Sequence, residues 1–167
     1  MLSERFVETM NEQIGREFAA AHQYLAVANY YAAETFPQLA AFFHRQAEEE
    51  RAHAMKMVEY LLDRDAAVEL GAIPEPRNGF PDHVEPIRIA LEQERRVTVQ
   101  INGLFEIARE TNDYQSEQFL QWFLEEQVEE ESTMNDLLAI AERTRELPMQ
   151  LEDYLARELP ADTDAAA

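Results

Sequence analysis

Four long stretches of this chain repeat apolar residues at intervals of three and four. Such spacing places the apolar side chains along one face of an α-helix. The whole chain of 167 residues holds only four glycines and seven prolines, which leaves few residues for turns. The sequence therefore predicts an all-α protein whose long helices cover about residues 3–34, 37–64 and 82–111 and, after a break at 112–113, continue to about residue 145.

The connections between these helices predict how they are arranged. Thr35 and Phe36 separate the first two helices, and Asn112 and Asp113 separate the last two, so each pair is expected to lie antiparallel. Residues 65–82 instead hold three prolines and two glycines, and they provide enough chain to run along a whole bundle. We expect a four-helix bundle with one long crossover between its second and third helices.

The C-terminal part of the sequence predicts one further short element. Pro148 suits the first turn of a fifth helix, which should end near Leu159, before Pro160. A helix this short is stable only when it packs against another element. We expect a single domain over residues 1–160, followed by a flexible tail at 161–167.

The charge of the chain limits its partners. Thirty-four Asp and Glu residues outnumber 14 Lys and Arg residues, which gives a formal net charge of −20. Nucleic acids and anionic membranes bind basic surfaces, so neither is an expected partner, whereas cations are. No cysteine is present, which excludes disulfides and thiolate-bound metals. The longest apolar run has five residues and no apolar signal core is found, so we expect a cytoplasmic protein.

Each predicted helix places at least one carboxylate on its apolar face. The spacing that runs through the apolar positions also includes, helix by helix, Glu17, then Glu50 and His53, then Glu94, and finally Gln127 and Glu130. Any one of these glutamates could bend toward solvent, and a single histidine on such a face is more often a packed core residue than a ligand. Four glutamates from four helices are different, because they cannot all ionise in one core without a positive partner.

This combination predicts a metal site. The four glutamates carry four negative charges, which two divalent cations would neutralise. Glu50 and His53 are three residues apart, so they share a helix face and can bind one ion together. Carboxylate and imidazole ligands suit iron, manganese or zinc, and glutamates with Glu-x-x-His pairs bind two metals in helical bundles. We therefore predict a dinuclear metal centre inside the bundle.

Longer motifs surround these residues: Asn-Glu-Gln-Ile-x-x-Glu at 11–17, Glu-Glu-x-x-His-Ala-Met at 49–55, and Gln-Trp-Phe-x-x-Glu-Gln-x-Glu-Glu at 121–130. With these motifs the chain resembles the bacterial non-haem ferritins from about residue 6 to residue 159. The stretches at 37–40 and 61–65 are similar to actinobacterial ferritins in particular. The resemblance implies that residues 1–160 form a ferritin-like di-iron domain.

The resemblance also implies a ferroxidase centre within each subunit. Glu17, Glu50 and His53 would hold one iron, and Glu50 would bridge to a second iron that Glu94 and Glu130 also hold. Two supporting residues would lie beside this pair of ions, namely Gln127 and Tyr24. A third, weaker iron site would lie at the edge of the centre, with the ligands Glu49, Glu126 and Glu129 and with Glu130 shared.

The function implied by the resemblance is iron storage. Such a protein oxidises Fe(II) with O2 and deposits ferric oxyhydroxide inside a hollow homo-oligomer of 24 subunits. Haem is not expected, because Arg51 follows Glu50 where bacterioferritins carry their haem-binding methionine. Two alternatives remain open: a di-iron or di-manganese oxidase of an organic substrate, and an acidic helical interaction protein whose glutamates are all solvated.

Overall fold

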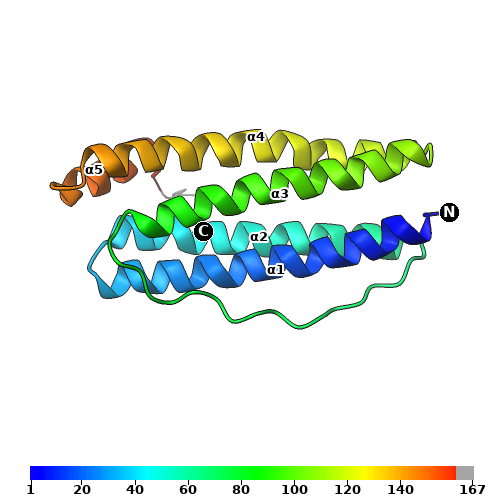
Figure 1. The fold of residues 1–167 in the computed structure, drawn as a ribbon, viewed down its shortest axis with the longest axis horizontal. Helices are drawn as coiled ribbons and strands as arrows, with labels where there is room; N and C mark the ends of the chain where they lie inside the picture. Colours follow the sequence, from blue (N-terminus) through cyan, green and yellow to red (C-terminus); the bar gives the residue numbers. More distant parts are fainter. Residues whose placement is uncertain (161–167) are drawn as a thin grey trace, which may run out of the picture.

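The computed structural model describes residues 1–160, and the tail predicted to be flexible at 161–167 lies outside this range. The described chain forms five helices and no strand: α1 (Glu4–Ala33), α2 (Pro37–Asp63), α3 (Glu85–Glu110), α4 (Tyr114–Arg143) and α5 (Pro148–Glu158). α1 pairs with α2, α3 pairs with α4, and α5 lies at one end of the four-helix bundle (Figure 1). The predicted all-α bundle with a short fifth helix is confirmed. None of these helices is both long and apolar enough to cross a membrane.

Side-chain caps explain where several helices begin. Ser3 and Asp113 each accept a hydrogen bond at 3.2 Å from a backbone amide three residues ahead, and they cap α1 and α4. The predicted start of the third helix at residue 82 is wrong. Asp82 accepts a hydrogen bond from the Glu85 amide at 2.9 Å, but it does so across a turn that precedes α3. The helix therefore begins at Glu85, three residues after its polar start signal.

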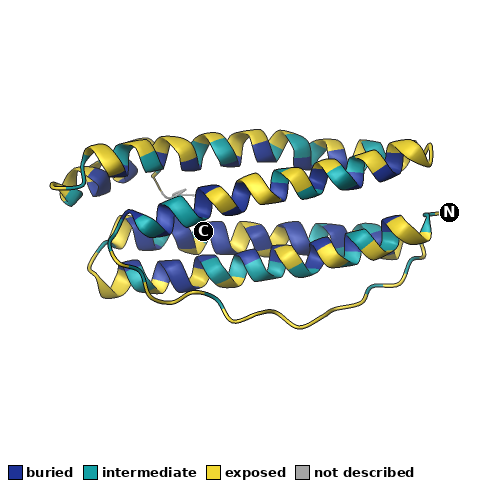
Figure 2. Cartoon of the chain, viewed as in Figure 1, coloured by how far each residue is buried: buried dark blue, intermediate teal, exposed yellow. Residues whose placement is uncertain are grey.

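Buried residues recur along the helices (Figure 2), and their apolar side chains form two clusters. The first apolar cluster includes residues of α5 and contains Tyr24, Tyr31, Phe43, Ile87, Leu137 and Leu151. The second apolar cluster lies toward the N-terminal end of α1 and contains Phe6, Met10, Met57, Ile101 and Phe123. All four long helices contribute to both clusters. On each long helix, the polar residues predicted to face inward lie between the residues that belong to the first apolar cluster and those that belong to the second.

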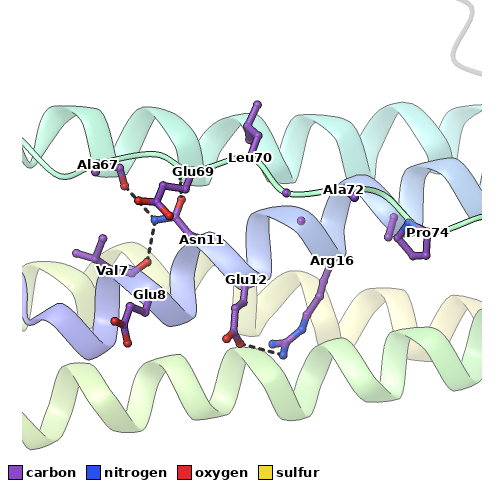
Figure 3. A pocket seen from close by; sticks show the side chains of 13 residues that line it. Val7, Glu8, Asn11, Glu12, Arg16, Ala67, Glu69, Leu70, Ala72 and Pro74 are labelled. Atoms are coloured by element: carbon purple, nitrogen blue, oxygen red, sulfur yellow. Dashed lines mark hydrogen bonds and ion pairs between the residues drawn. The ribbon is translucent and has the colours of Figure 1, made fainter.

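The crossover between α2 and α3 runs along the bundle beside α1 (Figure 1). Two amide side chains of α1 fasten it. Asn11 donates to the Ala67 carbonyl at 2.9 Å and accepts from the Glu69 amide at 2.8 Å (Figure 3). Gln23 makes the same pair of bonds with the backbone of Arg77, both at 2.9 Å. These bonds satisfy backbone groups that a segment without secondary structure would otherwise leave to water.

Apolar and polar contacts together hold α5 against the bundle. Leu151 and Leu155 are buried in the first apolar cluster. The carboxylate of Glu152 accepts hydrogen bonds from the backbone amides of Gln38 and Leu39 at 2.8 and 3.2 Å. The N-cap residue of α2 makes no side-chain cap within the described part of the chain, so Glu152 supplies that cap from α5.

Candidate metal centre

All four long helices contribute to a polar layer between the two apolar clusters. The six residues of this layer are at most 8% exposed: Glu17, Glu50, His53, Glu94, Gln127 and Glu130. Helical spacing explains their direction, because residues three or four positions apart lie on one helix face with the apolar residues around them. Polar groups buried this completely require hydrogen-bond or ionic partners.

Three residues of the polar layer form a compact group. One ligand atom from each of Glu17, Glu50 and His53 lies within 4.8 Å of the other two. The Nδ1 of His53 lies 3.7 Å from Glu50 Oε2 and 4.0 Å from Glu17 Oε2, which is too far for hydrogen bonds. Both of these buried Oε2 atoms accept no hydrogen bond from residues 1–160. Two unpaired carboxylate oxygens and an imidazole nitrogen therefore form a donor set that suits a divalent cation.

Glu94 lies in the same layer but is bonded differently. The hydroxyl of Tyr24, which is fully buried, donates to Glu94 Oε1. The amide of Gln127 donates to Glu94 Oε2 at 3.2 Å and to the Glu94 carbonyl at 3.1 Å. Tyr24 and Gln127 thus fix the orientation of this carboxylate. Neither Glu94 nor Glu130 belongs to the compact group formed by the other three ligand candidates.

Two further buried amides contact the layer, and their positions were not assigned a role from the sequence. Gln13 donates to Glu17 Oε1 at 2.7 Å, and Gln46 donates to Glu130 Oε2 at 3.1 Å. Each precedes a glutamate of the layer by four residues, Gln13 before Glu17 and Gln46 before Glu50. That spacing places amide and glutamate on one helix face, so it is the signal that could have found them.

The electrostatics of the layer favour protons or cations. Burial raises the pKa values of Glu17, Glu50 and Glu94, and repulsion from a neighbouring glutamate adds to each shift. Burial, and then repulsion from Glu94, raises the pKa of Glu130 to about 9. These carboxyl groups are therefore costly to ionise in the absence of a positive partner. A divalent cation would take the place of the protons and remove that cost.

Aromatic packing surrounds the imidazole of His53. Its ring meets Trp122 edge to face at a centroid distance of 5.4 Å and Phe123 at 5.8 Å. The ammonium group of Lys56 lies 3.6 Å from the centroid of the Trp122 ring. This cation–π contact and the two ring contacts restrict the orientation of the imidazole.

The acids expected at the edge of the centre are only partly brought together. Glu49 and Glu129 are exposed, and with Glu130 they line a hollow of about 220 Å³ between α2, α4 and the end of α5. Glu126 is half-buried and does not line this hollow, although its charge contributes to the raised pKa of Glu130. The structure thus groups two of the three outer acids with Glu130.

The polar layer is separate from a large cavity of the described chain. That cavity has a volume of about 780 Å³ and lies between α1 and the crossover (Figure 3). None of the residues of the polar layer lines it. A large pocket for an organic molecule therefore does not coincide with the compact group of ligand candidates.

The fold and the layer together define a class of protein: a helical bundle whose facing helices bury carboxylates and an imidazole, the arrangement in which such bundles bind metals. A family model described as Ferritin-like domain matches residues 7–144. Ferritin BfrB of Mycobacterium tuberculosis is 46% identical over 155 residues, which are 93% of this chain and 86% of that protein. A bacterial non-heme ferritin of Staphylococcus aureus is 44% identical over 132 residues, covering 79% of this chain and 80% of that protein.

The solved structures agree with these relatives. An open pore ferritin from the archaeon Archaeoglobus fulgidus has a TM-score of 0.89 and 31% identity, covering 93% of this chain and 97% of that chain. The chain belongs to the ferritin family, which confirms the resemblance stated from its motifs. Membership in this family supports iron binding and iron storage.

Proposed function

We propose that this protein stores iron and oxidises Fe(II) with O2 at an intrasubunit di-iron centre in the polar layer. One observation carries the proposal: four glutamates and one histidine from four helices are buried in one layer, and three of them, Glu17, Glu50 and His53, bring ligand atoms within 4.8 Å of one another, with unpaired carboxylate oxygens beside the imidazole. Ionising these buried carboxyl groups together has a large free-energy cost when no cation is present. Two divalent cations bound by the same groups would lower that cost. Iron enters this centre as the substrate of the oxidation.

The proposed ligands divide between two ions. Glu17, Glu50 and His53 hold the first ion, which fits the compact group that these residues form. Glu94 and Glu130 hold the second ion, and Glu50 bridges the two. Two ions held about 3.5–4 Å apart can each give one electron to the same oxygen molecule. The protein contributes by fixing the distance between the two ions before the reaction begins.

Supporting residues orient the ligands of the second ion. Tyr24 and Gln127 both donate to Glu94, so they hold its carboxylate in place. Burial, together with the charge of Glu94, raises the pKa of Tyr24 well above its ordinary value, which keeps the hydroxyl protonated as a donor. Glu49, Glu126 and Glu129 are proposed to bind a third, weaker iron with Glu130. The hollow beside Glu130 supports Glu49 and Glu129 in this role more directly than Glu126.

The proposal includes assembly into a hollow homo-oligomer of 24 subunits in the cytoplasm, where ferric oxyhydroxide is deposited. Residues 1–160 act as the single domain of each subunit. The net charge of −20 on each chain would attract Fe(II) toward such a particle. Because salt screens this attraction, the first phase of iron uptake should slow as ionic strength rises.

Gel filtration combined with iron staining tests this function. After incubation with Fe(II) in air, we expect the protein to elute at several hundred kilodaltons and to co-elute with ferric iron far in excess of three ions per chain. A small particle that retains two metals per chain would favour an oxidase of an organic substrate. Elution without any bound iron would favour an acidic interaction protein and contradict the proposal.

A further inference from the structure

The amide nitrogen of Gln127 contacts three oxygens. It donates to the backbone carbonyl of Glu94 at 3.1 Å, to Glu94 Oε2 at 3.2 Å and to Thr98 Oγ1 at 3.3 Å. The nitrogen has two hydrogens, which these three acceptors share. The backbone carbonyl accepts whether or not the Glu94 carboxyl group carries a proton, so this side of the layer requires the nitrogen end of the amide and not its oxygen end.

Thr98 is the one of these partners that lies outside the polar layer. It is a half-buried residue of α3, four positions after Glu94. Its hydroxyl donates to Glu131 Oε1 on α4 at 2.5 Å, a distance typical of a hydroxyl that donates to a carboxylate, and lies 3.1 Å from the Glu94 carbonyl. A hydroxyl has a single hydrogen. Once that hydrogen is directed to either of these acceptors, the Thr98 oxygen can only accept from Gln127.

A second hollow, between α3 and α4, explains why this contact matters. It has a volume of about 460 Å³, and its lining includes Thr98, Gln127 and Glu131. Gln127 itself is only 3% exposed. Because there is open space beside the amide, packing alone does not determine which of its two ends faces Glu94. The hydrogen bond to the Thr98 oxygen supplies that selection.

The direction of the amide affects how Glu94 can hold an ion. With the nitrogen toward Glu94, Gln127 bonds one carboxyl oxygen while the Tyr24 hydroxyl bonds the other, so the group is fixed in one orientation. A reversed amide would place its oxygen against the carboxyl oxygen, and that hydrogen bond would be lost. The reversed oxygen would also compete with Glu94 for a cation. Partners that orient a ligand in this way strengthen metal binding.

We propose that Thr98 is a positioning residue of the metal centre: its hydroxyl oxygen holds the amide nitrogen of Gln127 against Glu94 and thereby orients a ligand of the second ion. Glu131 assists because it takes the hydrogen of the Thr98 hydroxyl. This inference rests on the proposed function, since it concerns the ion that Glu94 and Glu130 hold. Thr98 acts through Gln127 and is not itself a ligand.

Zinc reports on the two ions separately and without any oxidation step. Crystals soaked at a series of Zn(II) concentrations give the occupancy of each ion by anomalous scattering at the zinc edge. Thr98→Val keeps the shape of the side chain and removes the hydroxyl. It should raise the Zn(II) concentration for half-occupancy of the second ion by about tenfold, the lower end of the effect of ligand-orienting partners, and leave the first ion unchanged. An unchanged second ion would overturn the proposal.

Two further variants separate positioning from folding. Thr98→Ser keeps the hydroxyl and should restore the affinity for the second ion. Thr111→Val is the matched control, because Thr111 lies at the C-terminal end of α3 and also donates to the carbonyl four residues before it, at 2.9 Å from Ile107. It should leave both ions unchanged. A loss in Thr98→Ser or in Thr111→Val as large as in Thr98→Val would contradict a specific role for the Thr98 hydroxyl.

A double-mutant cycle tests whether Thr98 acts through Gln127. Gln127→Leu should weaken the binding of the second ion, and Thr98→Val should cause no further loss in that background. Additive losses would contradict the proposed route through the amide. Absence of both zinc peaks from the unsubstituted protein would contradict the proposed centre itself, which is a different result from an unchanged second ion in Thr98→Val.

Discussion

The polar layer and the apolar clusters on either side of it are both buried, but burial has opposite effects on the stability of the fold in the two regions. Phe43 and Glu94 are both fully inaccessible to solvent. Burial of the phenyl ring stabilises the fold, by about 25 cal/mol for each Å² removed from water. Burial of the carboxyl group has a cost, because it disfavours the ionised form, as the raised pKa of Glu94 shows. The clusters thus explain why the bundle is stable, whereas the cost of the layer is consistent with the metal binding that we propose for it.

The largest effect should come from a substitution in the first apolar cluster. Phe43 packs against Tyr24 and Tyr31, with both ring centroids 5.6 Å away. Phe43→Ala should lower the free energy of unfolding of the metal-free protein by about 3–5 kcal/mol, because it removes a buried ring and leaves a cavity. Denaturant titration measures this loss. Glu50→Ala is the matching substitution in the polar layer. If it lowered the free energy of unfolding as much as Phe43→Ala does, the proposed difference between the two regions would be contradicted.

A second test measures how the stability of the metal-free protein depends on pH, because burial of the carboxyl groups in the layer disfavours their ionised form. The pKa of Glu130 is raised to about 9 in the fold, so the folded state keeps a proton that the unfolded state releases near the ordinary glutamate pKa. Stability from this group is present below the unfolded pKa and is lost as pH rises toward 9. Between pH 6 and pH 8 the metal-free protein should lose about 2–3 kcal/mol of stability for each proton that the coupled carboxyl groups of the layer retain.

Thermal and chemical unfolding at the two pH values measure this slope. Glu130→Gln is the control, because an amide of similar size does not titrate, and it should reduce the slope. Saturating Zn(II) should reduce it as well, since the cation takes the place of the proton. An identical slope in Glu130→Gln would contradict the role of Glu130 in this pH dependence.

A smaller effect is expected at the contact between α5 and α2. Glu152 caps the first turn of α2 through two backbone amides. Glu152→Ala should cost about 1–2 kcal/mol, the usual contribution of a helix cap. Asp153→Ala is the matched control, because Asp153 is the exposed neighbour on the same helix. Equal unfolding midpoints for the two variants would contradict the role of Glu152 as a cap.

These residues also indicate what the sequence could predict. The long helices and the inward direction of Glu17, Glu50, Glu94 and Glu130 follow from local spacing, because one helix face repeats every three or four residues. The cap that Glu152 provides could not be predicted in this way, since its partner Gln38 lies 114 residues away. Contacts of that kind depend on how whole helices pack.

The amides that contact the layer, Gln13 and Gln46, could be predicted from the sequence only in part. Gln13 and Gln46 lie four residues before Glu17 and Glu50, so local spacing places them on the correct face. That spacing does not reveal that Gln46 reaches Glu130 on α4, because this contact joins two helices. The start of α3 was misplaced for another physical reason: Asp82 caps a turn and not the helix itself.

The central claim, a pair of iron ions bridged by Glu50, is tested most directly by the rate of Fe(II) oxidation in Glu50→Ala. Stopped-flow absorbance after addition of two Fe(II) per subunit in air should show rapid oxidation in the unsubstituted protein and in Glu48→Ala, an exposed neighbour on α2. In Glu50→Ala the rate should fall by at least about tenfold, equivalent to about 1.4 kcal/mol of transition-state stabilisation. The apoprotein should remain as stable or become more stable, because one buried carboxylate is removed. Unchanged rapid oxidation in Glu50→Ala would contradict the proposed centre.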